Sequence, residues 1–280
     1  MLRTTTGLRV LGPDDVDAAR RVVARDPLTN VFVGHRIDVT GLQPRWLGGE
    51  VWGWAEDGRL VSLCHHAANL VPVEATPQAL AAFAERAAQG RRTCSSIVGP
   101  RADVEILWDL LRPAWGRPRS ERWNQPFMTV SGPATMAPDP RVRPVLLDEL
   151  DVLYPASVAM YTEEVGVSPE NGEGASYRAR VAQLISRGWA FARIDDGEVV
   201  FKAEVGAATA EACQVQGVYV HPNHRGEGLA AAAVAAVIAH AQRTIAPVVT
   251  LYVNHHNVPA RRAYERAGFR QTGTFATILF

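Results

Sequence analysis

The stretch that sets the fold of the second half of the chain is Val218-Tyr219-Val220-His221-Pro222-Asn223-His224-Arg225-Gly226-Glu227-Gly228-Leu229-Ala230. It predicts a strand, a tight loop rich in glycine and then an Ala-rich helix. Gly226 and Gly228 carry no Cβ atom, so the loop can curl tightly and a ligand can reach its backbone. The first N–H groups of the helix have no intrahelical partner and lie at the positive end of its dipole. The stretch therefore predicts a site for a phosphate or a pyrophosphate.

Two common nucleotide motifs are excluded by the same residues. The loop has no Gly-Lys-Ser/Thr ending, so it is not a P-loop. It also lacks the G-x-G-x-x-G fingerprint of dinucleotide-binding folds. The anion should therefore belong to a ligand other than ATP or NAD.

The composition is that of a globular protein with room for two domains. The chain has 280 residues, of which 47% are hydrophobic and 21% charged. The formal net charge is zero, which argues against a mainly electrostatic grip on nucleic acid or an anionic membrane, so neither is expected as a partner. Lys202 is the only lysine, so nearly all of the positive charge is arginine.

The cysteines and the apolar runs predict a reduced, cytoplasmic protein. Cys64, Cys94 and Cys213 are odd in number, far apart and without metal-ligand spacing, so no disulfide framework is expected. The segment 1–7 lacks the apolar run of a signal peptide, and no stretch is apolar for about 20 residues. We expect a monomer or a homodimer.

The pattern of elements predicts two domains with the same order of elements. Both halves are expected to run strand, two helices, strands, helix, strand, helix and strand. Residues 131–140, rich in Pro, Gly and small side chains, form the best linker candidate. The expected division is a first domain at 1–131, a linker at 132–141 and a second domain at 142–280.

A second motif lies downstream of the Gly-rich loop. The loop itself matches R/Q-x-x-G-x-G/A and follows a Val-x-Val-x-Pro strand at Val218–Pro222. Asn257–Phe269 matches N-x-x-A-x-x-x-Y-x-x-x-G-F. Both motifs, in this order and on these elements, resemble the GNAT superfamily of acyl-CoA-dependent N-acetyltransferases over residues 142–280. The resemblance implies an α/β (α+β) fold with a mixed, mostly antiparallel sheet flanked by helices.

The resemblance also implies a role for each matching residue. Acetyl-CoA would be the co-substrate, and Tyr264 would act as the general acid that protonates the departing thiolate. Asn257 and Tyr264 are seven residues apart, so they share one face of a helix. The implied CoA-binding residues are Val218, Tyr219, Val220, Arg225, Gly226, Glu227, Gly228, Leu229, Ala230, Asn257 and Tyr264.

The second half departs from the family at the position of the base. Many members place a Glu on the central strand, where this chain has Gln214 or Gln216, and an amide cannot act as a base. Glu164 is our candidate for the base or for a contact with the amine. Glu163, Glu164, Glu204 and Gln214 are the candidate substrate-binding residues, because carboxylates at the mouth of an acceptor site attract a cationic amine.

Two pairs of adjacent histidines, His65-His66 and His255-His256, do not predict a metal site. Neighbouring side chains on a strand point to opposite faces and rarely chelate one ion, so no metal is expected. His221 and His224 flank the Gly-rich loop and could meet phosphate or solvent.

The expected function is N-acetyl transfer from acetyl-CoA to a primary amine, by direct attack in a ternary complex. The acceptor could be a protein lysine, a protein N-terminus or a small molecule. One alternative is a non-catalytic acyl-CoA-binding regulatory module, which the missing Glu supports; another is transfer of a longer acyl group. The first half lacks R-x-x-G-x-G/A and resembles a degenerate GNAT-like domain, as in two-domain actinobacterial members.

Overall fold

The computed structural model describes residues 6–280 in two compact units, each of which is described by itself. Unit 1 consists of the chain up to Phe127 together with Gln271–Phe280, and unit 2 of Met128–Arg270. Residues 1–5, which belong to the segment examined for a signal peptide, lie outside the described residues. No helix among the described residues is long and apolar enough to cross a lipid bilayer.

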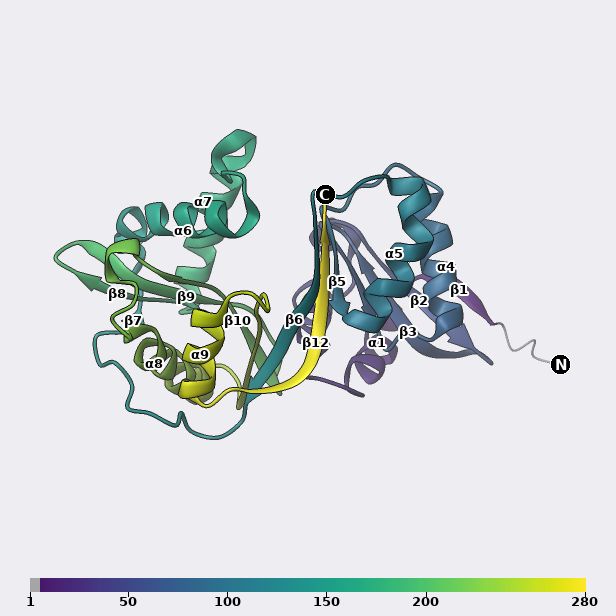
Figure 1. The fold of residues 1–280 in the computed structure, drawn as a ribbon. Helices are drawn as coiled ribbons and strands as arrows, with labels where there is room; N and C mark the ends of the chain where they lie inside the picture. The colour runs from purple at the N-terminus through teal and green to yellow at the C-terminus, as the bar shows by residue number, and fades with distance from the viewer. Residues whose placement is uncertain (1–5) are drawn as a thin grey trace. The chain divides into compact units, whose positions relative to one another are not determined.

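Unit 1 is a sheet with strand order β1-β2-β3-β4-β5-β12-β6, flanked by helices (Figure 1). The pairs β1–β2, β2–β3, β3–β4 and β5–β12 are antiparallel, and β4–β5 is parallel. Its elements are β1 (Gly7–Val10), η1 (Pro13–Asp15), α1 (Val16–Val23), α2 (Val31–Thr40), α3 (Pro44–Leu47), β2 (Glu50–Glu56), β3 (Arg59–His66), β4 (Asn69–Val73), α4 (Pro77–Ala88), β5 (Ser96–Pro100), α5 (Arg101–Trp115), most of β6 (Ser120–Val130) and β12 (Arg270–Leu279).

The last strand of the chain completes the sheet of unit 1. β12 pairs antiparallel with β5, and its residues Ala276 and Ile278 are fully buried in the same apolar cluster as Ile97. The division of the chain by contacts thus differs from the boundaries expected from sequence, which placed everything after residue 142 in one domain. The alternation of buried side chains predicts a strand but does not say which sheet the strand joins.

Unit 2 contains the end of β6 and the strands β11-β10-β9-β8-β7 in this order. β10 and β11 pair parallel, and β7–β8, β8–β9 and β9–β10 pair antiparallel. Its elements are β7 (Arg143–Pro144), η2 (Leu147–Glu149), α6 (Leu150–Val165), α7 (Glu170–Ser186), β8 (Ala190–Asp195), β9 (Glu198–Ala208), β10 (Ala212–Val220), η3 (Pro222–His224), α8 (Leu229–Thr244), β11 (Val248–Tyr252) and α9 (Val258–Ala267).

Helices cover both faces of the unit 2 sheet. Figure 1 shows α6 and α7 on one side of β8–β10 and α8 and α9 on the other. Phe201 packs in the core with α8, whereas Val199, on the other side of a register shift in the β8–β9 pairing, packs in the core with α6 and α7. Because strand side chains alternate, Lys202 and Glu204 on β9 point toward α6 and α7. This face of the sheet therefore carries two buried ionisable residues, which makes it the candidate for a catalytic site.

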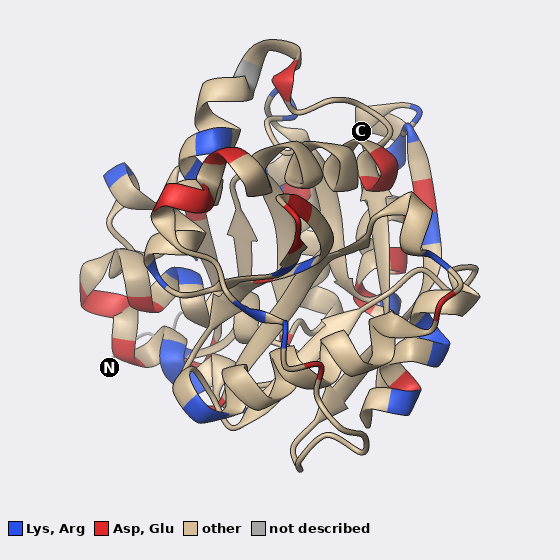
Figure 2. Cartoon of the chain, turned by 90° about the vertical axis from the view of Figure 1, so that its left-hand side faces the viewer, with Lys and Arg blue, Asp and Glu red and all other residues tan. Residues whose placement is uncertain are grey.

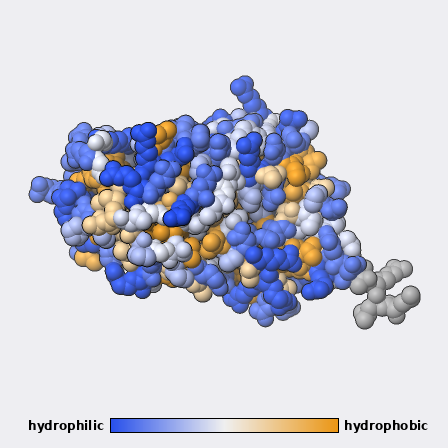
Figure 3. Space-filling model, turned by 60° about the horizontal axis from the view of Figure 1, so that its bottom comes forward, coloured by the Kyte–Doolittle hydropathy of each residue, from blue (hydrophilic) through white to orange (hydrophobic). Residues whose placement is uncertain are grey.

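The surface in view carries its apolar residues as small separate patches. Figure 3 shows a mainly hydrophilic face on which the hydrophobic areas are divided by polar side chains. Scattered exposed apolar residues of this kind are normal in globular proteins and need no partner to explain them.

Candidate active site

The Gly-rich loop has the predicted strand–loop–helix form. β10 ends at Val220 and α8 starts at Leu229, with Gly228 as its N-cap residue. Gly226 and Gly228 have φ angles of 84° and 78°, a left-handed conformation that favours glycine. The N-cap residue has no side chain to accept from the first turn of α8. Those N–H groups can therefore bind an anion.

The side chain of Arg225 fastens this loop to α6. Its guanidinium donates to both carboxylate oxygens of Glu163, at 3.0 and 2.7 Å, and Nε donates to the carbonyl of Val220 at 3.0 Å. It also lies over the ring of Tyr219, 5.6 Å from its centroid. Hydrogen bonding by Glu163 raises the pKa of Arg225. The loop thus offers its backbone, and Arg225 holds that backbone in place.

β10 and β11 separate where the loop approaches. Their parallel register runs from Ala212↔Val248 to Gln214↔Thr250, and no pair is recorded beyond it among the described residues, although β10 continues to Val220. On its other side β10 stays paired with β9, with a register shift between Gln216 and Tyr219. The edge of residues 218–220 that faces β11 is therefore open to an extended polyamide ligand.

A buried carboxylate lies beside the irregular part of β10. Glu204 receives a hydrogen bond from Lys202 Nζ at 2.8 Å and one from Gln216 Nε2 at 2.9 Å. Burial alone would raise the pKa of Glu204, but the nearby Lys202 ammonium and the two hydrogen bonds outweigh it and lower this pKa. Gly217, with φ of 59°, brings the backbone so close that a Cβ would lie 3.1 Å from Cδ of Glu204 and 3.0 Å from Cε of Met160.

Helix α6, which packs against the strand that carries Glu204, also carries a charge that acts on Tyr264. Its side chain is 7% exposed on α9 and packs edge-on against Phe269. Burial, with a contribution from the Glu164 carboxylate, raises the pKa of Tyr264. Met160 and Glu164 are four residues apart on α6 and so share a face. One turn of α6 therefore carries the side chain beside Gly217 and a carboxylate whose charge acts on Tyr264.

Three tyrosines of α6 and α7 form an aromatic cluster. The ring of Tyr177 lies 5.2 Å from that of Tyr161 and 6.1 Å from that of Tyr154, and its hydroxyl donates to the carbonyl of Ser157 at 3.0 Å. Burial, with a contribution from Glu204, raises the pKa of Tyr177. Tyrosine faces beside a carboxylate attract a cation.

The structure gives the predicted site residues different surroundings. Glu163 is held by Arg225, Glu164 accepts from Asn254 Nδ2 at 3.2 Å, and Glu204 is buried. Gln214 is buried on β10 in the paired part of the strand. The Asn257 side chain accepts from Ala260 N at 3.2 Å and so caps α9.

Sequence reasoning missed Lys202 as a site residue, although a signal was present. It is the only lysine among 29 basic residues, and it stands two residues before Glu204 on a strand, where the two side chains must share a face. Tyr177 and the bend at Gly217 carried no comparable signal. Around unit 2, acidic and basic segments are interspersed and do not gather into one face of a single sign (Figure 2).

Two family models match successive parts of the chain. A model described as the acetyltransferase (GNAT) family matches residues 159–269, and one described as a domain of unknown function (DUF4081) matches residues 49–153. No curated protein sequence matches the chain.

Solved structures resemble nearly the whole chain. A GNAT-family acetyltransferase from Colwellia psychrerythraea is 13% identical with a TM-score of 0.59, covering 98% of this chain and 99% of that one. A GCN5-related N-acetyltransferase from Sphaerobacter thermophilus is 18% identical with a TM-score of 0.60, covering 98% and 95%. A tandem GNAT protein from the clavulanic acid biosynthesis pathway is 14% identical with a TM-score of 0.56, covering 98% of each chain. At these identities the likeness shows the fold, including its tandem form.

Proposed function

Residues 159–269 belong to the acetyltransferase (GNAT) family, and we propose that the protein transfers an acetyl group from acetyl-CoA to a primary amine. Membership of the family supports acyl-CoA-dependent acetyl transfer in general terms. The nature of the acceptor, the roles of single residues and the order of events belong to the proposal.

The donor would bind along the open edge of β10 and at the start of α8. The pyrophosphate of CoA would accept hydrogen bonds from the backbone of Arg225–Ala230. The pantetheine arm, a polyamide, would pair with residues 218–220 where β11 has separated from β10. Asn257 would contact the CoA arm from the start of α9. The thioester would then lie between Gly217 and Tyr264.

The acceptor would enter on the α6–α7 side. Glu204 is the carboxylate that this geometry favours as the base, because it is held ionised beside the bend of β10. Glu164, next to Tyr264, would attract the amine, and Gln214 would contribute a polar lining. Tyr161 and Tyr177 would bind the amine through their ring faces.

The proposed reaction is one addition followed by one elimination. The neutral amine attacks the thioester carbon, and a C–N bond forms while the proton of the amine passes to Glu204, directly or through water. Backbone N–H groups at the separated part of β10 stabilise the oxyanion. The C–S bond then breaks, and the Tyr264 hydroxyl gives its proton to the departing thiolate. The observation that carries the proposal is that Met160 and Glu164 are one turn apart on α6: Met160 lies at the bend beside Glu204, and the charge of Glu164 acts on Tyr264.

A panel of acceptors tests the proposal. The purified protein is mixed with acetyl-CoA and with lysine peptides, peptides with free N-termini and small primary amines, and released CoA thiol is measured. We expect thiol release that depends on at least one amine class. Tight binding of acetyl-CoA with no turnover on any acceptor would favour the regulatory module instead. Turnover only with longer acyl-CoA donors would move the proposal to that donor class.

A further inference from the structure

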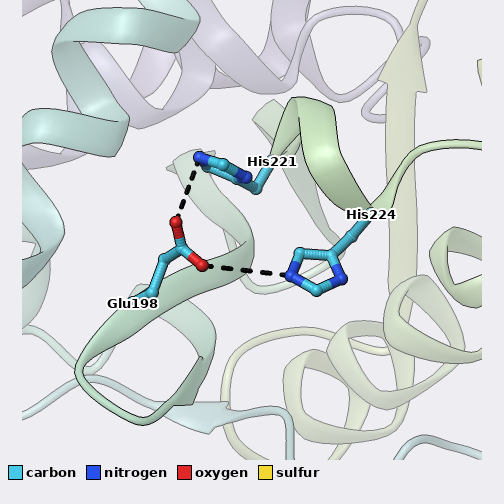
Figure 4. Close-up of side chains that lie close together, drawn as sticks. All are labelled: Glu198, His221 and His224. Carbon is cyan, nitrogen blue, oxygen red and sulfur yellow. Dashed lines mark ion pairs between the residues drawn. The ribbon is translucent and has the colours of Figure 1, made fainter.

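Three side chains that can ligate a metal meet beside the entry to the Gly-rich loop. Glu198 opens β9, His221 directly follows β10, and His224 ends the short helix η3 (Figure 4). His221 Nε2 lies 3.3 Å from Glu198 Oε1, and His224 Nε2 lies 3.9 Å from Glu198 Oε2. One donor atom from each residue lies within 4.8 Å of the other two.

The backbone beneath the cluster is fixed, whereas the side chains can adjust. His221 N donates to the carbonyl of Val200 at 3.0 Å, which fastens the end of β10 to β9, and His224 N donates to the carbonyl of His221 at 2.9 Å. The side chains of His221, His224 and Glu198 are 26%, 31% and 53% exposed. Small rotations can therefore bring the donor atoms together without disturbing the core.

We propose that Glu198, His221 and His224 form a binding site for a divalent transition metal of the Zn²⁺ type. Two imidazoles and one carboxylate are ligands that Zn²⁺ takes at about 2.0–2.2 Å, which corresponds to roughly 3.4 Å between ligand atoms in a tetrahedral site. The distance from His221 to Oε1 of Glu198 is already close to that value, and the distance from His224 to Oε2 exceeds it by an amount that a small side-chain rotation removes. A fourth position is left for water or another small ligand.

The surroundings of His224 suit a metal ligand. Its second ring nitrogen, Nδ1, lies 3.5 Å from Glu227 Oε2, so that a carboxylate can orient the ring while Nε2 binds the ion. The carboxylate of Asp195 also acts on His224. Three carboxylates thus lie around the two imidazoles, and the local charge favours a divalent cation.

His221 must change its tautomer when the metal binds. Its Nδ1 accepts from the backbone N–H of Asn223 at 3.4 Å, so in the metal-free protein Nε2 carries the proton and faces Glu198. Metal binding at Nε2 moves that proton to Nδ1, and the bond from Asn223, already at the long end of the hydrogen-bond range, opens. Metal binding should therefore change the hydrogen bonding of the His221 ring.

This site goes beyond acetyl transfer and does not depend on it. The ion would join the start of β9 to the segment 221–224, directly before the loop that begins at Arg225. The adjacent histidine pairs of the sequence do not predict this site, and Glu198 lies too far along the chain to be linked to His221 and His224 without the fold.

Zinc titration of the tag-free full chain, stripped with chelator, tests the site. Isothermal calorimetry should show one equivalent of Zn²⁺, and Co²⁺ should give the visible absorption of a tetrahedral site. Glu198→Gln and His224→Ala should each weaken binding at least tenfold, and Glu227→Gln about tenfold. His256→Ala, an exposed histidine outside the cluster, is the matched control and should bind like the wild type.

Two outcomes would overturn the proposal. One is the absence of Zn²⁺ binding to the wild type at about 100 μM, and the other is wild-type binding in both Glu198→Gln and His224→Ala. Circular dichroism checks that the variants are folded, and Zn²⁺ should raise the melting temperature of the wild type and of His256→Ala only. His221→Asn serves as the third ligand variant if either of the first two does not fold.

Discussion

Lys202 and Glu204 form a buried ion pair on β9, in a position where strands usually carry apolar side chains. Both residues are almost fully buried, and each supplies what the other needs: the ammonium neutralises the carboxylate, and Gln216 occupies its second oxygen. A buried pair of this kind contributes little to stability by itself, because desolvation costs about as much as the attraction gives. Its position beside Gly217 points instead to a role in proton transfer.

Substitutions at Glu204 and at Lys202 should distinguish a role in proton transfer from a role in stability. Glu204→Gln should lower kcat by about a hundredfold or more, because the amine loses its proton acceptor. Lys202→Met removes the ammonium, which is the largest of the effects that lower the pKa of Glu204, and leaves the hydrogen bond from Gln216 and the charge of Arg180 in place. Burial then weighs more, so this pKa rises and the acidic limb of the kcat/KM profile should move to higher pH. A Lys202→Met profile that superimposes on the wild type, in a protein with normal circular dichroism, would contradict this assignment.

His65 in unit 1 should make stability sensitive to acid. It is 2% exposed, packs edge-on against Phe32, and has its Nε2 buried without a partner among the described residues. Burial, with Arg36 and His66 adding and the carbonyl of Asn69 opposing, lowers its pKa from 6.5 to about 4. The unfolded chain therefore binds the proton first, and stability is lost as the pH falls below about 6.5 toward 4.

The size of this loss can be measured by urea unfolding. Between pH 7 and pH 5 the wild type should lose about 2 kcal/mol from this group, whereas His65→Leu should lose little of it. The exposed His256→Leu is the control and should follow the wild type. An identical pH dependence in His65→Leu and the wild type would show that this imidazole does not titrate as its burial requires.

Helix α6 links the parts of the site at the scale of elements. Its C-terminal turns place Met160 against Gly217, Glu163 on Arg225 and Glu164 near Tyr264. The helix thus sets both the position of the Gly-rich loop and the distance between the proposed base and acid.

Loosening α6 from the loop should affect donor binding. Glu163→Gln removes the charge that holds Arg225, so affinity for acetyl-CoA should fall about two- to fivefold, as expected for an exposed ion pair. Asp151→Asn is the matched control, because it breaks another exposed pair of the same helix, with Arg178, away from the loop. Calorimetric titration with acetyl-CoA measures both variants, and equal affinities in the two would show that the Glu163–Arg225 pair does not support donor binding.

The elements of the donor site could be predicted because their signals are local. Gly226 and Gly228, the Asn257 cap and the periodic apolar residues act through the backbone within a few positions. The choice of Glu204 over Glu163 and Glu164 as the proposed base, and the cluster around Glu198, could not be predicted, because register and bulges decide which distant side chains meet. Gln214 and Gln216 are two residues apart, yet a register shift follows Gln214, and only Gln216 is recorded in contact with Glu204.

At the scale of the whole molecule, the chain closes on the unit where it begins. β12 belongs to unit 1 by its pairing with β5 and by its buried residues, and Phe280 lies edge-on against Trp108 and Trp115. The C-terminal strand is therefore a structural part of unit 1 and cannot be removed without exposing its core.

A cavity in this strand should destabilise unit 1. Ile278→Ala removes a fully buried side chain and should cost about 2–5 kcal/mol. Of the seven tryptophans, all but Trp189 lie in unit 1, so tryptophan fluorescence during urea unfolding reports mainly on that unit. Thr272→Ala, exposed on the same strand, should change stability by less than about 0.5 kcal/mol. Equal midpoints for the two variants would place β12 outside the core of unit 1.

Tyr264→Phe is the variant that tests the proposed acetyl transfer, with Tyr264 as the acid. Phenylalanine keeps the packing against Phe269 and removes only the hydroxyl. With the best acceptor of the amine panel, kcat should fall by about a hundredfold, while the dissociation constant of acetyl-CoA changes less than about threefold. A Tyr264→Phe variant that releases CoA at the wild-type rate would contradict the account.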